Sequence, residues 1–372
     1  MMIYLDYAAT APMRPSAIQA YAETATSIVG NTQSLHDAGS SASRVLEGCR
    51  ELWGNLLNGR SEGMYFTGNA SEGNQLAIRS LLRGRTADKN EIITTKLEHA
   101  SVLSTLQEVE KEGVTIRYVP VDANGVLELK AYEKMVTNKT ALVAIQLVNS
   151  EMGAIQPIAR CAAIAKKQNV PLHCDMVQAI GKIPVNLASL GVTSAVFSGH
   201  KMGGPKGVGM VWIDPRVHWQ AVYEGTTHQQ GFRAGTIDVP GIVAATIAGK
   251  EALEEQQKTT HYATELQQYL MDQLPDSIVL TGDPTQKSPF IQGMILPHVE
   301  GQWMLLECNR HQIAISTGTA CNIGGEEAMS AMSAIGVEQD AARKFIRISF
   351  SASTSKSHID RLLHVIKTSM IS

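Results

Sequence analysis

Two residues that follow apolar segments of this sequence could together support carbonyl chemistry. Lys201 comes shortly after the apolar segment Ala195–Phe197, and Asp175 ends an earlier apolar segment, Val170–Asp175. A desolvated lysine loses its proton readily and can then form a Schiff base with an aldehyde. A carboxylate near it would keep a pyridine nitrogen protonated, so the pair predicts a site for pyridoxal 5′-phosphate.

Each of these residues also has an ordinary structural explanation. A lysine after a strand is commonly a solvated loop residue, and an aspartate there commonly caps a helix. The cofactor interpretation gains support because more polar side chains follow the other expected strands, where ligands of open α/β sheets bind. These further candidates are Ser71, His99, Asn149, Gln178, Ser198 and His200.

A possible phosphate site lies where Ala70 and Ser71 open an expected helix. The free backbone N–H groups of a helix start can cradle a phosphate. An ordinary N-cap with a nearby glutamate explains the same residues, and for an isolated segment that explanation would be preferred.

The elements that must position these side chains alternate between strands and helices from about residue 60 to residue 250. Helical periodicity covers 100–112, 127–136 and 158–168. Short, almost continuously apolar strands are typical of a sheet covered by helices on both faces. We therefore expect an α/β fold with a mixed, mostly parallel sheet. Its expected strands are Ile92–Thr95, Thr115–Val121, Ala141–Val148, Pro171–Asp175, Ala195–Ser198 and Gly209–Ile213.

The pattern changes after about Val239. A long helical stretch, Val239–Leu274, leads to short strands and two more helical segments, as in a smaller α+β unit. A chain of 372 residues is also too long for one ordinary core. We predict a large domain over 15–250 and a small domain made from 1–14 and 251–372. The small domain's expected elements are strands at Ile278–Thr281, Gln292–Leu296, Ile313–Ser316 and Phe345–Ser349 and helices at Glu326–Ile335 and Ser357–Thr368.

Composition narrows the class of protein. A net charge of −3 without a basic patch argues against nucleic-acid binding, and the longest apolar stretches, such as Ala141–Val148, are too short to cross a membrane. The start has no signal-peptide pattern and the five cysteines form no C-x-x-C pair, so we expect a cytoplasmic location. His173 and Asp175 could face one metal ion, but no further ligands complete a coordination sphere, so no metal is expected.

Seven segments follow one another along the chain in a recognisable order. They are LDYAAT at 5–10, GNTQSLH at 30–36, EH at 98–99, NSEMG at 149–153, DMVQ at 175–178, SGHKMGGPKG at 198–207 and RAGT at 233–236. Together they resemble the NifS/IscS family of pyridoxal-phosphate-dependent cysteine desulfurases, and the resemblance extends from residue 3 to about residue 352. The family has the class V aminotransferase fold, which is fold type I of pyridoxal phosphate enzymes. Any one of the segments is a weak signal, but their combination is specific.

The resemblance implies a role for each matching residue. Lys201 forms the Schiff base, Asp175 pairs with the ring nitrogen, and His99 stacks on the ring and moves protons. Gln178 hydrogen-bonds the ring hydroxyl, and Asn149 supports the ring or the substrate carboxylate. The phosphate is bound by Ala70, Ser71, Ser198 and His200, with Thr236 arriving from a second subunit. The role of Thr236 implies a homodimer with active sites at the interface.

Cys321 lies among small and polar residues in Ile315–Asn322, which favours an accessible thiol, although a lone cysteine is more often structural. The segment is similar to the family's S-x-G-[ST]-A-C motif, so the resemblance makes Cys321 the nucleophile. It also assigns Arg347 to the substrate carboxylate, a task that suits the planar guanidinium. The implied reaction takes sulfur from L-cysteine, gives L-alanine and leaves a persulfide on Cys321.

The resemblance further implies a protein acceptor for the sulfur, such as an iron–sulfur scaffold or client. Some NifS-like members are tied to the cluster of quinolinate synthase in NAD biosynthesis. A selenocysteine lyase, a sulfinate desulfinase or an aminotransferase shares the fold and stays an alternative. A non-catalytic sulfur-relay protein is disfavoured, because Lys201, Asp175 and Arg347 are all present.

Overall fold

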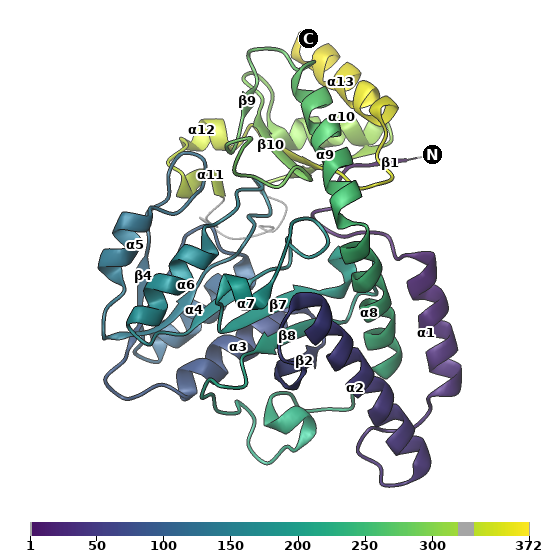
Figure 1. Cartoon of the computed structure of the whole chain (residues 1–372). Helices are drawn as coiled ribbons and strands as arrows, with labels where there is room; N and C mark the ends of the chain where they lie inside the picture. The colour runs from purple at the N-terminus through teal and green to yellow at the C-terminus, as the bar shows by residue number, and fades with distance from the viewer. Residues whose placement is uncertain (1, 319–330, 372) are drawn as a thin grey trace.

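A seven-stranded sheet lies at the centre of the larger, lower part of the molecule in Figure 1, a computed structural model that describes residues 2–318 and 331–371. Only β8 runs antiparallel to its neighbours in this sheet, so the expected α/β fold with a mixed, mostly parallel sheet is confirmed. The strand β2 was not expected from the sequence. The strands lie in the order β2 (Met64–Thr67), β8 (Gly209–Ile213), β7 (Ser194–Ser198), β6 (Leu172–Asp175), β5 (Thr140–Ala144), β3 (Glu91–Thr94) and β4 (Thr115–Tyr118).

Successive residues of the central strands enter two different cores, because side chains alternate between the faces of a sheet. Ile92 and Val196 pack on the face covered by α3 (Ala70–Arg83) and α4 (Ala100–Lys111). Their neighbours Ile93 and Phe197 pack on the other face. That face is covered by α2 (Asp37–Leu57), α5 (Leu129–Met135), α6 (Ile158–Lys167) and α8 (Val239–Glu254), with the short α7 (Leu187–Leu190) beside α6.

The contact between α2 and α8 depends on one tryptophan. The Trp53 ring stacks on Phe197 with centroids 6.1 Å apart, and its Nε1 donates to Thr246 Oγ1 at 3.0 Å. A Cβ at Gly249 would stand 2.3 Å from the Trp53 ring, so only glycine fits there. The helix α1 (Pro15–Ser27) packs along the outside of α8 (Figure 1).

A second, antiparallel sheet forms the upper part of the molecule in Figure 1. It has its own apolar core, shared with three helices. The sequence indicated one helical stretch over Val239–Leu274, and the structure divides it at Glu255, so that α8 packs on the central sheet and α9 on the second sheet. The strands are β12 (Ser316–Thr317), β13 (Phe345–Ser349), β10 (Ile291–Ile295) and β9 (Val279–Leu280), and the helices are α9 (Gln256–Met271), α10 (Gly301–Arg310) and α13 (Lys356–Ile371), with α11 (Ala331–Ala334) and α12 (Gln339–Ala342) beside them.

The N-terminal segment connects the two sheets. The strand β1 (Ile3–Tyr4) pairs in parallel with β11 (Ile313–Ala314), and Asp6 then forms a bridge with Ser349. Further along, the backbone N–H of Ala11 donates to the His200 carbonyl at 3.0 Å, at the edge of the central sheet. The domain limits 15–250 and 1–14 with 251–372 stay a prediction. Within residues 2–318 and 331–371, no helix combines the length and the apolar character needed to cross a bilayer.

Candidate active site

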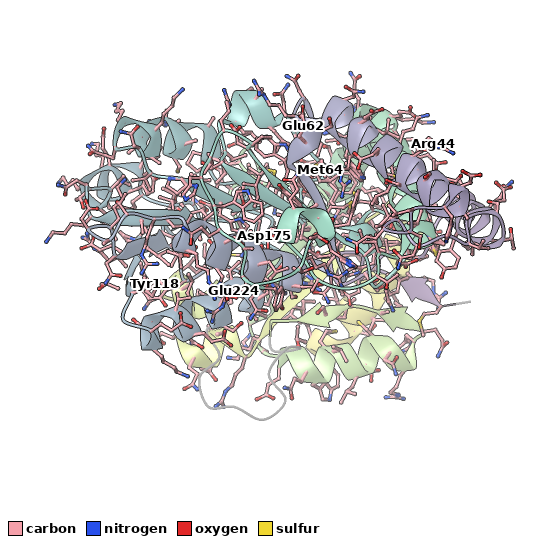
Figure 2. The ribbon with its side chains drawn as sticks, turned by 90° about the horizontal axis from the view of Figure 1, so that it is seen from below. Arg44, Glu62, Met64, Tyr118, Asp175 and Glu224 are labelled. Carbon is pink, nitrogen blue, oxygen red and sulfur yellow. The ribbon has the colours of Figure 1, made fainter. Side chains whose placement is uncertain are left out.

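Polar side chains follow four parallel strands at one edge of the central sheet. Asp175 ends β6, and Ser198 ends β7 and leads into the 3₁₀ helix η2 (Gly199–Lys201). His99 follows β3 and Asn149 follows β5. In Figure 2, Asp175 is labelled in the middle of the molecule, whereas Arg44 lies on the outer helix α2. Because these strands run in the same direction, their carboxyl ends meet at the edge where α/β sheets bind ligands.

The Lys201 amine reaches across to the N-terminal segment. Its Nζ donates to the Ala8 carbonyl and, at 2.7 Å, to the Ala9 carbonyl. Gln178 Nε2 donates to the same Ala8 carbonyl at 2.8 Å. The predicted Schiff-base lysine and the predicted partner of the ring hydroxyl therefore converge on one backbone oxygen.

The Asp175 carboxylate is buried and held in a fixed orientation. Its Oδ2 accepts from Asn74 Nδ2 at 2.8 Å, and its Oδ1 accepts from the Val177 N–H at 3.0 Å. The Asn74 Oδ1 in turn lies 3.0 Å from His173 Nε2, and His173 Nδ1 lies 2.6 Å from Ser194 Oγ. Burial lowers the pKa of His173 to about 4, so its ring is neutral at pH 7. This network fixes the orientation of the Asp175 carboxylate, and its pairing with a ring nitrogen stays a prediction.

The His99 side chain caps the helix α4. Its Nδ1 accepts from the Ser101 N–H at 3.1 Å and lies 2.8 Å from Ser101 Oγ. Because Nδ1 accepts this backbone N–H, the proton of the neutral ring lies on Nε2. The ring is exposed, which leaves a face available for stacking. The sequence offered capping as the alternative to a role at the cofactor; the structure shows the cap, and stacking of His99 on the cofactor ring stays a prediction.

The residues predicted for the phosphate lie around the ends of β7 and the start of α3. The Ser198 Oγ is buried and has no hydrogen-bond partner among the described residues. His200 Nδ1 lies 3.0 Å from Thr10 Oγ1, and burial with the charges of Lys201, Lys206 and Lys182 lowers the His200 pKa to about 4. Ala70 and Ser71 form the first turn of α3. An orphaned hydroxyl and a helix N-terminus fit a phosphate group.

Arg347, which was predicted to bind the substrate carboxylate, lies on β13. Its Nη2 pairs with Asp6 Oδ1 at 2.6 Å, and its Nη1 donates to the Ser150 carbonyl at 3.0 Å. Its Nε is buried and has no partner among the described residues. One N–H of this buried guanidinium therefore lacks a partner among the described residues, and the contact of Arg347 with a substrate carboxylate stays a prediction.

The Asn149 side-chain amide forms hydrogen bonds with nearby backbone groups. Its Oδ1 accepts from the N–H groups of Glu151 and Met152 at 2.9 and 2.8 Å, and its Nδ2 donates to the Leu97 carbonyl at 3.2 Å. These contacts are the turn chemistry that the sequence left open for this asparagine. Its contact with cofactor or substrate stays a prediction.

Sequence reasoning missed several residues of this edge, among them Asn74, Lys182 and Asp6. Asn74 lies one helical turn after Ser71, so the 3.6-residue period of α3 was the signal that could have found it. Glu98, beside His99, is fully buried; Thr95 Oγ1 donates to its Oε1 and the Gln146 N–H to its Oε2, both at 2.7 Å. Burial raises the Glu98 pKa to about 8, so this carboxyl is neutral at pH 7.

The described cysteines are all buried, and burial raises the pKa of each thiol. They are Cys49, Cys161, Cys174 and Cys308. Cys321, the predicted nucleophile, lies outside the described residues. Thr236 is exposed on the segment between the 3₁₀ helix η3 (His228–Gly231) and α8. Nowhere in 2–318 or 331–371 do three or more His, Cys, Asp or Glu side chains gather in a way that could hold a metal ion.

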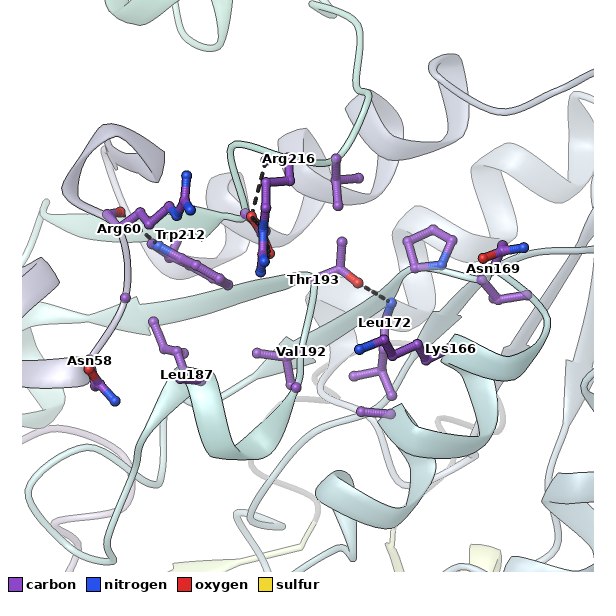
Figure 3. Close-up of a pocket in the computed structure, with 18 residues that line it drawn as sticks. Asn58, Arg60, Lys166, Asn169, Leu172, Leu187, Val192, Thr193, Trp212 and Arg216 are labelled. Carbon is purple, nitrogen blue, oxygen red and sulfur yellow. Dashed lines mark hydrogen bonds and ion pairs between the residues drawn. The ribbon is translucent and has the colours of Figure 1, made fainter.

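A wide cavity of about 710 Å³ lies at the opposite edge of the central sheet (Figure 3). Leu172 at the start of β6 and Trp212 near the end of the antiparallel β8 line it. Its cations include Arg216, which already pairs with Asp214 at 2.6 Å. None of the predicted site residues line this cavity, so its size is no evidence that it is the active site.

Comparisons with known proteins agree with the arrangement of the site. Residues 3–362 match the family model described as aminotransferase class-V. The chain is 41% identical to a putative cysteine desulfurase NifS of Bacillus subtilis strain 168, over 98% of this chain and 93% of the relative. It is 32% identical to a cysteine desulfurase of Mus musculus, over 98% and 81% of the two chains. A solved structure titled NifS-like protein superposes with a TM-score of 0.93 at 31% identity and covers all of both chains.

Proposed function

This chain belongs to the class-V aminotransferase family and is a pyridoxal-phosphate-dependent enzyme, and from this premise we propose that it is a cysteine desulfurase. It takes the sulfur of L-cysteine onto Cys321 and releases L-alanine. The observation that carries the proposal is that Lys201 and Asp175 lie at the carboxyl ends of strands of the central sheet, while Arg347 reaches toward them from β13 through its contacts with Asp6 and Ser150. The chain also aligns over nearly its whole length with cysteine desulfurases.

When bound, pyridoxal phosphate supplies an aldehyde for the substrate amine and an electron sink. The residues present fit this group. Asp175, oriented by Asn74, would face its ring nitrogen, while the unpartnered Ser198 hydroxyl and the first turn of α3 would hold its phosphate. Lys201, whose Nζ now donates to the Ala9 carbonyl, would supply the amine that binds the aldehyde.

The protein's own groups then have distinct tasks. Arg347 binds the α-carboxylate of the substrate through its free Nε–H. Lys201 takes the proton from Cα, and His99 presents its Nε2–H on the exposed side of the site. The Cys321 thiolate attacks the substrate Sγ, so that an S–S bond forms while the substrate Cβ–S bond breaks and Cβ is reprotonated to alanine.

A protein acceptor takes the sulfur from Cys321 in this proposal, either an iron–sulfur scaffold or a client such as quinolinate synthase. Support comes from the resemblance to the NifS-like branch. We also place the enzyme in the cytoplasm, where buried free thiols such as Cys161 and Cys174 stay reduced. Incubation of the persulfide form with a candidate acceptor, followed by detection of sulfur on that acceptor, tests the first point.

We further propose a homodimer in which Thr236 completes the phosphate site of the partner subunit. Supporting features are the full exposure of Leu35 in the loop before α2 and the contact between Gln33 and Thr227, 3.4 Å, which joins this loop to the segment that leads to Thr236. Mixing the variants Lys201→Ala and Thr236→Ala tests it. Mixed dimers regain one complete site if Thr236 acts across the interface, and regain none if it acts within its own subunit.

Mass spectrometry of the cofactor-loaded enzyme after incubation with L-cysteine tests the main proposal. We expect one additional sulfur on the peptide that contains Cys321, together with L-alanine. The variant Cys321→Ala should lose both sulfide release from cysteine and the adduct. Retained turnover of selenocysteine by this variant would instead favour a selenocysteine lyase, and transfer of the amino group to a 2-oxoacid without any adduct would favour an aminotransferase.

A further inference from the structure

A second lysine is buried next to the candidate site. Lys182 follows β6 in the sequence and is only 9% exposed. Its Nζ donates to Gln178 Oε1 at 2.7 Å, and its backbone carbonyl accepts from Thr260 Oγ1 at 2.9 Å. Within residues 2–318 and 331–371 it forms no ion pair with a carboxylate. A buried ammonium that lacks a counterion is strongly disfavoured, so its presence here calls for a function.

Lys182 determines which way the Gln178 amide points. Because the ammonium can only donate, it binds the carbonyl oxygen of that amide. The amide Nε2 is thereby directed to the Ala8 carbonyl at 2.8 Å, which also accepts from Lys201. Gln178 is consequently presented to the site as a donor, and the reversed amide would place two donors against each other.

The charges around Lys182 are mostly positive. Lys201 and Arg347 both act on it electrostatically, and Lys182 in turn acts on His200. Burial, with repulsion from Lys201 and Arg347, lowers the Lys182 pKa to about 7. Repulsion between two cations is mutual, so a charge at Lys182 also disfavours a proton on the Lys201 nitrogen.

We propose that Lys182 is a positioning residue, which keeps Gln178 oriented as a donor toward the cofactor ring and adds a positive charge that favours the unprotonated Lys201 nitrogen. The proposal rests on the proposed function, because it assigns Gln178 a contact with bound pyridoxal phosphate. It goes beyond that function because it assigns a positioning role to Lys182, which acts through Gln178 and through its charge rather than by contact with substrate or cofactor.

The test is a pH titration of the visible absorbance of the enzyme loaded with pyridoxal phosphate. In the variant Lys182→Met the midpoint should rise by about one pH unit, because a nearby positive charge is lost. Cofactor affinity, measured by equilibrium dialysis, should fall severalfold, since Gln178 is no longer held. Lys182→Gln removes the charge but keeps a donor for Gln178, so its midpoint should rise as well while its affinity falls less.

Lys287 provides the matched control. It is also buried, at 6% exposure, and its Nζ likewise donates to a glutamine oxygen, that of Gln292 on β10. Lys287→Met should leave the midpoint unchanged.

A midpoint that matches the parent in either folded Lys182 variant, or an equal shift in Lys287→Met, would overturn the inference. Failure of the parent protein to take up pyridoxal phosphate at all would instead overturn the function on which it rests. If Lys182→Met does not fold, Lys182→Gln decides the question.

Discussion

The two edges of the central sheet differ in what they contain: one has buried polar side chains and the other has a large open cavity. At one edge, buried polar groups such as Asp175, Ser198 and Lys182 gather in a confined region. At the other edge lies the open cavity of about 710 Å³, where Arg216 pairs with Asp214 and is 71% exposed. Burying a polar or charged group costs free energy, whereas leaving it in water costs little. Asp214 is also buried beside the cavity, but its charge is paired with Arg216, whereas the Ser198 hydroxyl at the first edge has no partner among the described residues. The edge where such groups gather is therefore the one where function is sought.

Among the variants that compare the two edges, the largest effect is expected at Asn74, which connects the Asp175 carboxylate to His173. Asn74→Ala removes a buried hydrogen bond to an anion, so kcat/KM for sulfide release should fall about 10–100-fold. The surface variant Asn55→Ala, on α2, serves as the control and should retain parental activity. An Asn74→Ala enzyme with unchanged kinetics would show that Asp175 needs no fixed orientation.

An intermediate effect, on stability rather than rate, is expected at Glu98. Its folded-state pKa of about 8 lies above the ordinary 4.5, because burial favours the neutral form. The folded state therefore binds a proton more tightly than the unfolded state, and the resulting stabilisation is complete below about pH 4.5 and is lost as the pH rises through 8. The loss amounts to about 1.4 kcal/mol per pH unit in that window.

The variant Glu98→Gln cannot ionise. Between about pH 5 and pH 8, the range in which the parent loses this stabilisation, the free energy of unfolding of the variant should therefore fall less than that of the parent. Urea denaturation at several pH values measures this difference. Glu110→Gln, at an exposed position of α4, should follow the parental profile. Parallel curves for the parent and Glu98→Gln would mean that Glu98 is ionised in the folded protein.

The smallest effect is expected at the opposite edge. Arg216→Ala removes an ion pair whose arginine is largely in water, and such pairs contribute little. Its kcat/KM should stay within about twofold of the parental value. A tenfold loss, measured in the same assay as Asn74→Ala, would show that the cavity takes part in the reaction and would remove the contrast between the edges.

The sequence predicted helices and strands best where an apolar segment was clear and polar residues showed where it begins and ends. Phe345–Ser349 was expected as a strand and is β13 with the same limits, since its side chains are all buried. The strand Met64–Thr67 was missed, because its four buried residues show no period before a glycine-rich helix start. The division of Val239–Leu274 at Glu255 was missed too, because Glu255 is itself a good helix former and the bend comes from packing on two different cores.

The site residues predicted from motifs largely meet at one edge, while their supporting residues were not predicted. Lys201, Asp175, Gln178 and Ser198 stand at strand ends, which a pattern of apolar runs can locate. Asn74 and Lys182 act through contacts between distant segments, such as Asn74 with Asp175. The helical period of α3 places Asn74 on the same side as Ser71, but neither residue type nor spacing shows that it contacts Asp175, because this contact depends on how a helix and a strand pack against each other.

The course of the N-terminal segment has a consequence for biosynthesis. Asp6 and its partner Arg347 are 341 positions apart, and β1 pairs with β11. During translation, the residues that leave the ribosome first therefore stay without these partners until almost the whole chain has emerged, and closing the loop then costs conformational entropy. Complete assembly of the candidate active site, which includes the pair Asp6–Arg347, is thus a late step that follows synthesis of most of the polypeptide.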